Sequence, residues 1–176
     1  MAHSAVVRIR PCEPADVLAV QQIYAHHVTT GFGTFEEEPP PVEEMKRRLD
    51  SIVRARFPFV VAEIDGRVAG YGYAGPFRTR ASYRFTCENS VYVAPQMLRH
   101  GVGFAVMRDV IDACRRLQMT QMLAVIGDSE NAGSIGLHSR LGFERVGVFR
   151  NVGFKFGRWV DVVLMQLDLS ATAVGT

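Results

Sequence analysis

Apolar side chains recur at helical spacing in three stretches of the chain. In order, the aligned apolar residues are Val17, Val20, Tyr24 and Val28; Val42, Met45, Leu49 and Ile52; and Val102, Val106, Val110, Cys114 and Leu117. A fourth, shorter helix is predicted from Gly142, which suits the position just beyond a helix. The pattern therefore predicts helices over 15–28, opened by Pro14, and over 42–56, 102–117 and 131–143.

Shorter apolar runs between turn residues predict strands at 6–11, 58–64, 67–77, 82–95 and 121–127, with two more inside 144–169. Asp65 and Gly66 form a hairpin turn between the second and third runs, and Pro95 ends the fourth. Glycines and prolines in 29–41 predict a loop, which carries Phe32 and Phe35. This order of elements indicates a mixed α/β fold with helices on both faces of one sheet.

The length of 176 residues suits a single domain over 1–176, with an ordered core at about 6–169 and a polar tail at 170–176. Charged residues make up 22% of the chain and the formal net charge is +2, so no strong attraction to nucleic acid is expected. Cys12, Cys87 and Cys114 form no CxxC pair and no metal-binding spacing, which favours a reducing compartment. We find no signal-peptide pattern and no apolar stretch of membrane-spanning length, and we expect a soluble, cytoplasmic protein.

Two glycines stand between a strand and a helix in the stretch "LRHGVGFAVM", residues 98–107. Glycine lets main-chain N–H groups approach a phosphate, and the N-terminus of the following helix favours negative charge. Alternatively, Gly101 and Gly103 only shape the turn between strand and helix. A dinucleotide-binding loop fits less well, because the third glycine and the later acidic residue of that motif are missing.

A second segment, "NAGSIGLHSRLGF" at 131–143, follows the next strand. With "GVG", it resembles the GNAT superfamily of acyl-CoA N-acetyltransferases. Four further stretches resemble the branch that acetylates phosphinothricin and methionine sulfone or sulfoximine. These are "GTFEEEPP", "GPFRTRASYRFTCENSVYVAP", "SENAGSIGLHSRLGF" and "FKFGRWVDVVLMQ", which occur in this order along nearly the whole chain.

The resemblance implies a central, mostly antiparallel, twisted mixed sheet in which two parallel strands splay apart to bind acetyl-CoA. The main chain of Val91, Tyr92 and Val93 would pair with the pantetheine arm. The pyrophosphate would lie on Arg99, His100, Gly101, Val102, Gly103 and Phe104, with Asn131 and Ser134 along the arm. The family usually has Arg or Gln three residues before the first glycine, where this chain has Leu98. Arg99 or His100 would then supply the positive charge, and no metal is expected.

Two residues are candidates for moving protons in acetyl transfer. Glu88 precedes "VYV" by three positions and is the candidate base, acting through water, although it also suits a solvated strand carboxylate. His138 lies where many family members carry a Tyr that protonates the leaving thiolate. It suits this role, or a histidine packed beneath the cofactor. If Glu88 is a bystander, the base is a water held by carbonyls, or His138.

An amino-acid acceptor brings a carboxylate and a polar head, which planar Arg donors suit. The candidate acceptor residues are Phe35, Arg78, Thr79, Arg80, Tyr83 and Arg84. At least one of these arginines is expected to be a plain surface charge. His26 and His27 are expected on a helix surface and make a poor metal pair.

We therefore expect an acetyl-CoA-dependent enzyme that acetylates the α-amine of a small amino acid by direct transfer. The alternatives are a polyamine or a protein amine as acceptor, or a non-catalytic acyl-CoA-binding module. The resemblance also implies a homodimer. Phe154, Phe156 and Trp159 lie close together near the C-terminus and could form its interface, or belong to the core.

Overall fold

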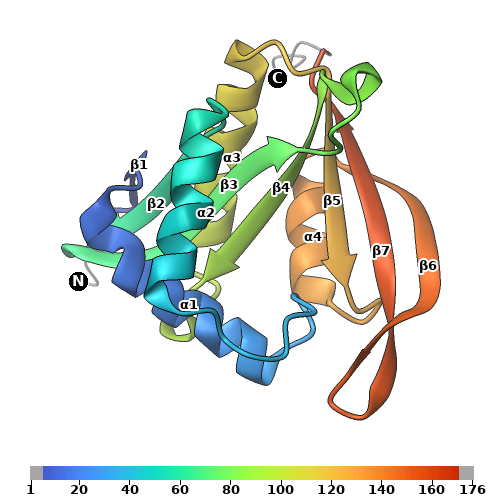
Figure 1. The fold of residues 1–176 in the computed structure, drawn as a ribbon, viewed down its shortest axis with the longest axis horizontal. Helices are drawn as coiled ribbons and strands as arrows, with labels where there is room; N and C mark the ends of the chain where they lie inside the picture. The colour runs from blue at the N-terminus through green and yellow to red at the C-terminus, as the bar shows by residue number, and fades with distance from the viewer. Residues whose placement is uncertain (1–5, 171–176) are drawn as a thin grey trace.

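A computed structural model describes residues 6–170 and shows one seven-stranded sheet (Figure 1). The strands are β1 (Arg8–Pro11), β2 (Phe59–Ile64), β3 (Arg67–Pro76), β4 (Thr86–Val93), β5 (Gln121–Gly127), β6 (Glu144–Lys155) and β7 (Arg158–Asp168). They lie in the order β1-β2-β3-β4-β5-β7-β6, and only the β4–β5 pair is parallel. The expected mixed, mostly antiparallel sheet is thus confirmed.

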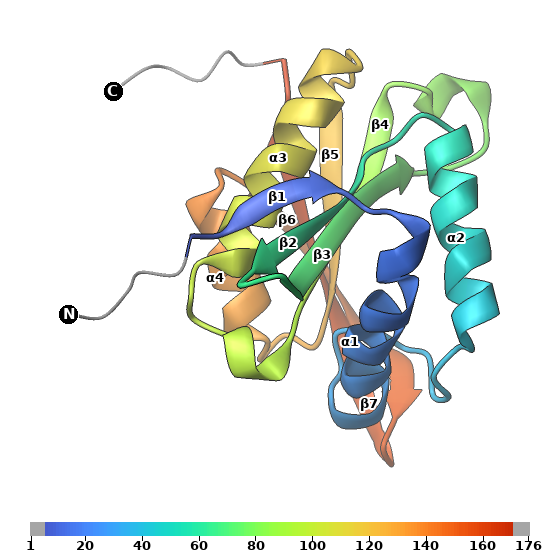
Figure 2. The same cartoon turned by 90° about the vertical axis from the view of Figure 1, so that its left-hand side faces the viewer.

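Helices cover both faces of this sheet, as predicted (Figure 2). The helices are α1 (Val17–Thr30), α2 (Val42–Arg54), α3 (Val102–Arg116) and α4 (Ala132–Arg140). α1 and α2 bury Val20, Val28 and Leu49 against one face, and α3 buries Val106 and Val110 against the other. α4 lies on the α3 side, where its Leu137 packs on the same core.

Several predicted boundaries were wrong, for local reasons. Residues 82–85 belong to no strand, because Ala81–Tyr83 forms a 3-10 turn in which Arg84 N–H donates to the Ala81 carbonyl. β1 starts at Arg8, since its partner strand turns away at Asp65 and leaves Val6 unpaired and 83% exposed. α1 runs on to Thr30, after a 3-10 turn at Pro14–Asp16. The predicted tail lies outside the described residues from 171 onward.

β4 and β5 separate partway along their length. They pair only over Thr86–Asn89 and Gln121–Ala124. Beyond this point β4 stays with β3 as far as Val93, opposite Gly70, while β5 stays with β7 as far as Gly127, opposite Val162. The two strands therefore splay, as the resemblance implied, and their facing main-chain groups are free of each other.

Candidate active site

A cavity of about 1220 Å³ passes through the splay. Its walls come from both faces of the sheet. On the α3–α4 side lie Gly101, Phe104, Asn131 and His138, and on the α1 side lie His27, Phe32, Ser90 and Tyr92. Because β4 alternates its side chains, Ser90 and Tyr92 point to the face opposite Asn89 and Val91. Two molecules approaching from opposite faces could therefore meet in this opening.

The start of α3 forms a concave turn at one end of the cavity. Arg99 and Gly101 both have left-handed backbones, with φ of 66° and 78°. The first helical hydrogen bond joins the Ala105 N–H to the Gly101 carbonyl, at 3.0 Å. The three N–H groups of 102–104 therefore have no partner within the helix, and they suit an anion. This geometry favours the anion-binding interpretation of the two glycines.

The predicted residues of this turn have different surroundings. Arg99, Gly101, Gly103 and Phe104 line the cavity, and so does Leu98, while Val102 is buried and the His100 ring contacts the Leu98 carbonyl. A Cβ at Gly103 would lie 3.2 Å from Leu137 and 3.4 Å from Val93. Gly103 therefore lets α3 approach α4 and β4 closely. Arg140 of α4 also lines the cavity and adds a positive charge that the sequence analysis did not identify.

The main chain of β4 faces the opening at alternate residues. The Ala94 N–H donates to Ala69 on β3, so the Val93 carbonyl points the other way, into the splay. The same alternation turns the N–H and carbonyl of Val91 toward the splay. His27 reaches in from α1, and its Nε2 donates to the Val93 carbonyl at 2.9 Å. The expectation that His27 lies on a helix surface was therefore wrong: it is half-buried, packs on Tyr92 and lines the cavity.

Asn131 caps α4 at the cavity wall. Its side-chain oxygen accepts from the Ser134 N–H at 3.1 Å, and its Nδ2 donates to the Gly127 carbonyl at 3.3 Å. The amide thereby ties the helix start to the end of β5, and both Asn131 and Ser134 line the cavity.

His138 is 2% exposed and lines the cavity on the α3–α4 side of the splay. Its Nε2 lies 3.0 Å from Asn89 Oδ1, and its Nδ1 lies 2.8 Å from the Ser134 carbonyl. Asn89 in turn donates to the Leu123 carbonyl at 3.0 Å, across the last paired position of β4 and β5. Burial lowers the pKa of His138, against the hydrogen bond to Ser134 that raises it.

Glu88 lies on the opposite face, with its side chain on the α1–α2 side. Burial raises the pKa of its carboxyl group. The side chains of Ser90 and Tyr92 follow on the same face. The nearby Tyr73 is half-buried, and this burial raises the pKa of its phenol. The sheet therefore separates Glu88 from His138, and of the two only His138 lines the cavity. The alternation of side chains along β4 would have predicted that Ser90 lies on the face of Glu88. No local sequence pattern predicts that Tyr73 lies near them.

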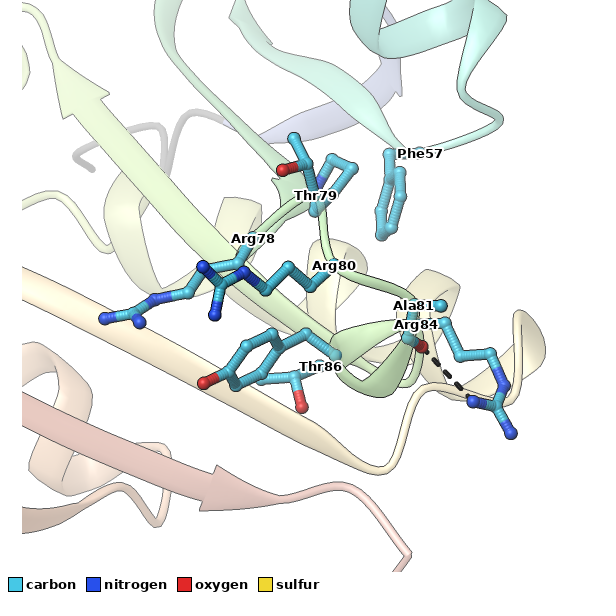
Figure 3. A pocket seen from close by; sticks show the side chains of 9 residues that line it. Phe57, Arg78, Thr79, Arg80, Ala81, Arg84 and Thr86 are labelled. Carbon is cyan, nitrogen blue, oxygen red and sulfur yellow. Dashed lines mark hydrogen bonds between the residues drawn. The ribbon is translucent and has the colours of Figure 1, made fainter.

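The arginines of the β3–β4 loop line a different, smaller hollow of about 360 Å³ (Figure 3). Its residues are Phe57, Pro76, Arg78, Thr79, Arg80, Ala81, Tyr83, Arg84 and Thr86. Arg78 and Arg80 extend in one direction, and Arg84 extends away from them toward the Ala81 carbonyl. None of the predicted acceptor residues of this loop lines the large cavity of the splay. The predicted loop residues thus lie together around one hollow, apart from the splay of β4 and β5.

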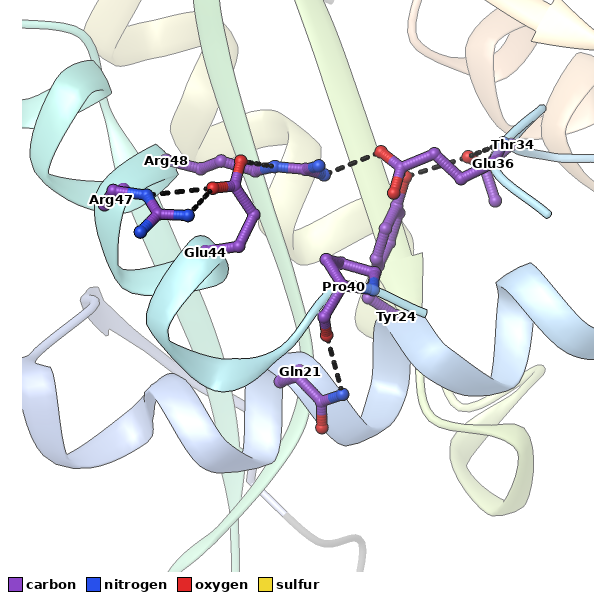
Figure 4. Close-up of polar contacts among 8 residues, drawn as sticks. All are labelled: Gln21, Tyr24, Thr34, Glu36, Pro40, Glu44, Arg47 and Arg48. Atoms are coloured by element: carbon purple, nitrogen blue, oxygen red, sulfur yellow. Dashed lines mark hydrogen bonds and ion pairs between the residues drawn. The ribbon is translucent and has the colours of Figure 1, made fainter. Parts of the chain in front are cut away.

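The loop between α1 and α2 forms the cavity wall on the α1 side. Gly31, Phe32 and Gly33 line it, and the Phe35 ring packs on the backbone of Gly127 and Gly153. On the helix side, Tyr24 bonds Thr34 and Glu36, and Arg48 pairs with Glu36 at 2.7 Å (Figure 4). This pairing neutralises one carboxylate of the acidic run "FEEE".

The cavity suits acetyl-CoA on three structural grounds. It holds a turn with uncommitted N–H groups for phosphate, an open strand edge for amide pairing, and an opening that connects both faces. Among residues 6–170, no group of three or more His, Cys, Asp or Glu is placed to hold a metal ion. No helix within the same range is long and apolar enough to cross a membrane.

Comparison with known proteins identifies the family. The model of the acetyltransferase (GNAT) domain matches residues 9–164. Phosphinothricin N-acetyltransferase of Alcaligenes faecalis is 47% identical over 163 residues, which cover 93% of this chain and 83% of that protein. L-methionine sulfoximine/L-methionine sulfone acetyltransferase of Pseudomonas paraeruginosa is 37% identical over 165 residues, covering 93% and 95%.

A solved structure agrees with these matches. The GNAT superfamily phosphinothricin acetyltransferase of Sinorhizobium meliloti, in complex with AcCoA, has a TM-score of 0.91 and 38% identity, covering 97% of this chain and 92% of that one. Fold, strand splay and sequence therefore agree, and the chain belongs to the GNAT family of acetyltransferases.

Proposed function

We propose that this chain transfers the acetyl group of acetyl-CoA to the α-amine of a small amino acid of the methionine sulfone, methionine sulfoximine or phosphinothricin type. The single observation that carries the proposal is the continuous cavity through the splay. It joins a phosphate-suited helix start on one face to Ser90 and Tyr92 on the other. The curated relatives named for these three acceptors support this substrate class.

In the proposed reaction the neutral amine attacks the thioester carbonyl, the C–S bond breaks, and the thiolate leaves as CoA. A free α-amine has a pKa of about 7.7–8.0, so a modest base acting through water suffices to take its proton. Glu88 lies on the acceptor side and is the proposed base. His138 lies on the cofactor side and is the proposed donor to the thiolate. The raised pKa of the Glu88 carboxyl suits a group that must accept a proton near neutral pH.

A polyamine acceptor is disfavoured by the charges around the α1–α2 loop. Arg48 pairs with Glu36, and three arginines lie on the β3–β4 loop. These arginines, Thr79, Tyr83 and Phe35 remain proposed acceptor residues. The pairing of Glu36 with Arg48 leaves less uncompensated negative charge beside the α1–α2 loop for a cationic acceptor.

The test is CoA thiol release with a panel of acceptors. We expect turnover with methionine sulfone, methionine sulfoximine and phosphinothricin, and much less with spermidine or a protein amine. A preference for spermidine or for the protein amine would contradict the proposed amino-acid substrate and indicate that amine as the acceptor. Tight acetyl-CoA binding without thiol release from any amine would favour a non-catalytic binding module.

We also propose a homodimer and a cytoplasmic location. The dimer proposal rests on apolar side chains exposed along β6 and β7: Phe149, Val152, Phe154, Phe156 and Trp159 are each between 54% and 61% exposed. The proposed location is supported by Cys12, Cys87 and Cys114, which are all free thiols.

A further inference from the structure

Lys155 is a buried cation at the end of β6. The residue is 1% exposed, and its Nζ donates to two main-chain carbonyls, Gly31 at 2.9 Å and Thr34 at 2.8 Å. Both carbonyls belong to the α1–α2 loop, more than 120 positions away in the sequence. The β6–β7 hairpin thus holds this loop through one ammonium group.

The rest of the contact between hairpin and loop is close and largely apolar. The Phe35 ring and the Phe32 carbonyl occupy the positions where Gly153 and Gly127 would carry a Cβ. The Phe32 ring packs edge-on to Phe156 at 5.4 Å, and the Arg158 guanidinium lies 4.0 Å from its centroid. Within this contact, Lys155 supplies the protein donor for both the Gly31 and the Thr34 carbonyl.

The opposite side of the loop is held by α1 and α2. Tyr24 bonds the Thr34 hydroxyl at 2.8 Å, so Thr34 is fixed through its side chain by the helix and through its carbonyl by Lys155. Between these two attachments, Gly31, Phe32 and Gly33 form the cavity wall on the face where the acceptor is proposed to enter. The position of that wall depends on both attachments.

We propose that Lys155 is a positioning residue for the acceptor, acting through the α1–α2 loop. It fixes the wall formed by 31–33 and contacts neither substrate. This proposal rests on the proposed function for its acceptor, while the docking of the loop is independent of it. A methionine of similar length would keep the apolar stem and leave both carbonyls without a donor.

Hydrogen exchange of Lys155→Met tests the docking without any substrate. We expect the amides of 31–36 to exchange about tenfold faster than in the wild type, with α3 unchanged. Lys46, on the exposed face of α2, is the only other lysine of the chain, so Lys46→Met is the matched control. Unchanged exchange of 31–36 in a folded Lys155→Met variant would overturn the proposal.

Steady-state kinetics test the effect on the acceptor. Lys155→Met should raise the acceptor KM about tenfold while changing the acetyl-CoA KM by less than about threefold, and Lys155→Arg should restore part of the loss. Equal effects on both substrates would reduce Lys155 to a structural role and overturn the proposal. If the wild type acetylates no amino acid, the proposed function is wrong. The hydrogen-exchange measurement still tests whether Lys155 holds the α1–α2 loop in place.

Gly153→Ala is a second variant that leaves the ammonium in place. The new methyl group would displace the Phe35 ring and so shift the same loop. It should reproduce the selective rise in acceptor KM, and it carries the test if Lys155→Met does not fold. A folded Gly153→Ala enzyme with a normal acceptor KM would contradict the role of the loop as acceptor wall.

Discussion

Glu88 and Asn89 are neighbours on β4 and serve opposite faces of the sheet. The carboxylate of Glu88 lies on the α1–α2 side, whereas Asn89 bonds His138 of α4 at 3.0 Å on the other side. The strands separate directly after Asn89. The two residues proposed to move protons, Glu88 and His138, therefore lie on opposite faces of the sheet.

Replacing Glu88 by Gln tests its proposed role as the base. We expect turnover to fall about 10²–10⁴-fold, the usual contribution of a positioned base, with acetyl-CoA affinity nearly unchanged. The measurement is thiol release with methionine sulfone, alongside calorimetry with acetyl-CoA. Glu43→Gln, on the exposed face of α2, is the control for loss of one carboxylate.

The pH dependence adds a second criterion for Glu88. Because burial raises the pKa of its carboxyl, wild-type activity should rise with pH through that raised value, as the carboxylate forms. The variant should not show this rise of activity with pH. Its loss of turnover relative to the wild type should become smaller above about pH 8, where more of the amine is already neutral. If Glu88→Gln turns over as fast as the wild type at pH 7, Glu88 is not the base. The base would then be a water held by carbonyls, or His138.

At the scale of elements, the start of α3 combines a special backbone with a function. Gly101 has φ of 78° and no heavy atom within 4 Å of where a Cβ would lie, so only the backbone angle restricts this position inside the protein. The open space in front of it belongs to the cavity. A side chain here would both strain the turn and enter the proposed phosphate site.

Gly101→Val should therefore weaken acetyl-CoA binding by about tenfold or more, because the new side chain would enter the proposed phosphate site. The left-handed backbone would in addition lower the stability of the variant by about 1–2 kcal/mol. Gly66→Val is a matched control, because Gly66 has φ of 74° in the β2–β3 turn and does not line the cavity. We expect both variants to lose stability in thermal unfolding and only the first to lose affinity in calorimetry. Equal affinity in both would remove the anion site from this turn.

At the scale of the whole molecule, the β6–β7 hairpin links the candidate site to an exposed apolar surface. Its inner side holds the α1–α2 loop through Lys155, and Asp161 accepts from Ser129 and Arg150 beside the start of α4. Its outer side exposes Phe154 and Trp159, which pack on each other with ring centroids 5.2 Å apart. An edge strand with exposed aromatics favours association with a second surface.

We expect light scattering at micromolar concentration to give a dimeric mass, and Trp159→Glu to give a monomeric one, because a buried interface does not tolerate an unpaired carboxylate. Val53→Glu is the control, since Val53 is 54% exposed on α2, away from the hairpin. A monomeric wild type would contradict the dimer. Loss of the dimer in the control alone would place the interface elsewhere.

The sequence by itself determined the elements and the family. Apolar spacing predicted α1, α2 and α3, and Gly142 indicated α4. Asp65, Gly66 and Gly142 have the left-handed backbones that their turn positions suggested. Alternation along β4 is also enough to place Ser90 and Tyr92 on the face of Glu88, although neither side chain was among the predicted acceptor residues. These properties depend on a residue and its near neighbours, so a local pattern is enough to encode them.

Only the tertiary structure decided which groups far apart in the sequence contact each other around the cavity. His138 meets Asn89 across 49 positions, His27 meets the Val93 carbonyl across 66, and Lys155 meets the Gly31 carbonyl across 124. Two of these contacts end on main-chain carbonyls, which every residue type provides, so the sequence carries no signal for the partner. The loop arginines had a clear local signal, but their distance from the cavity depends on how β3 and β4 lie in the sheet.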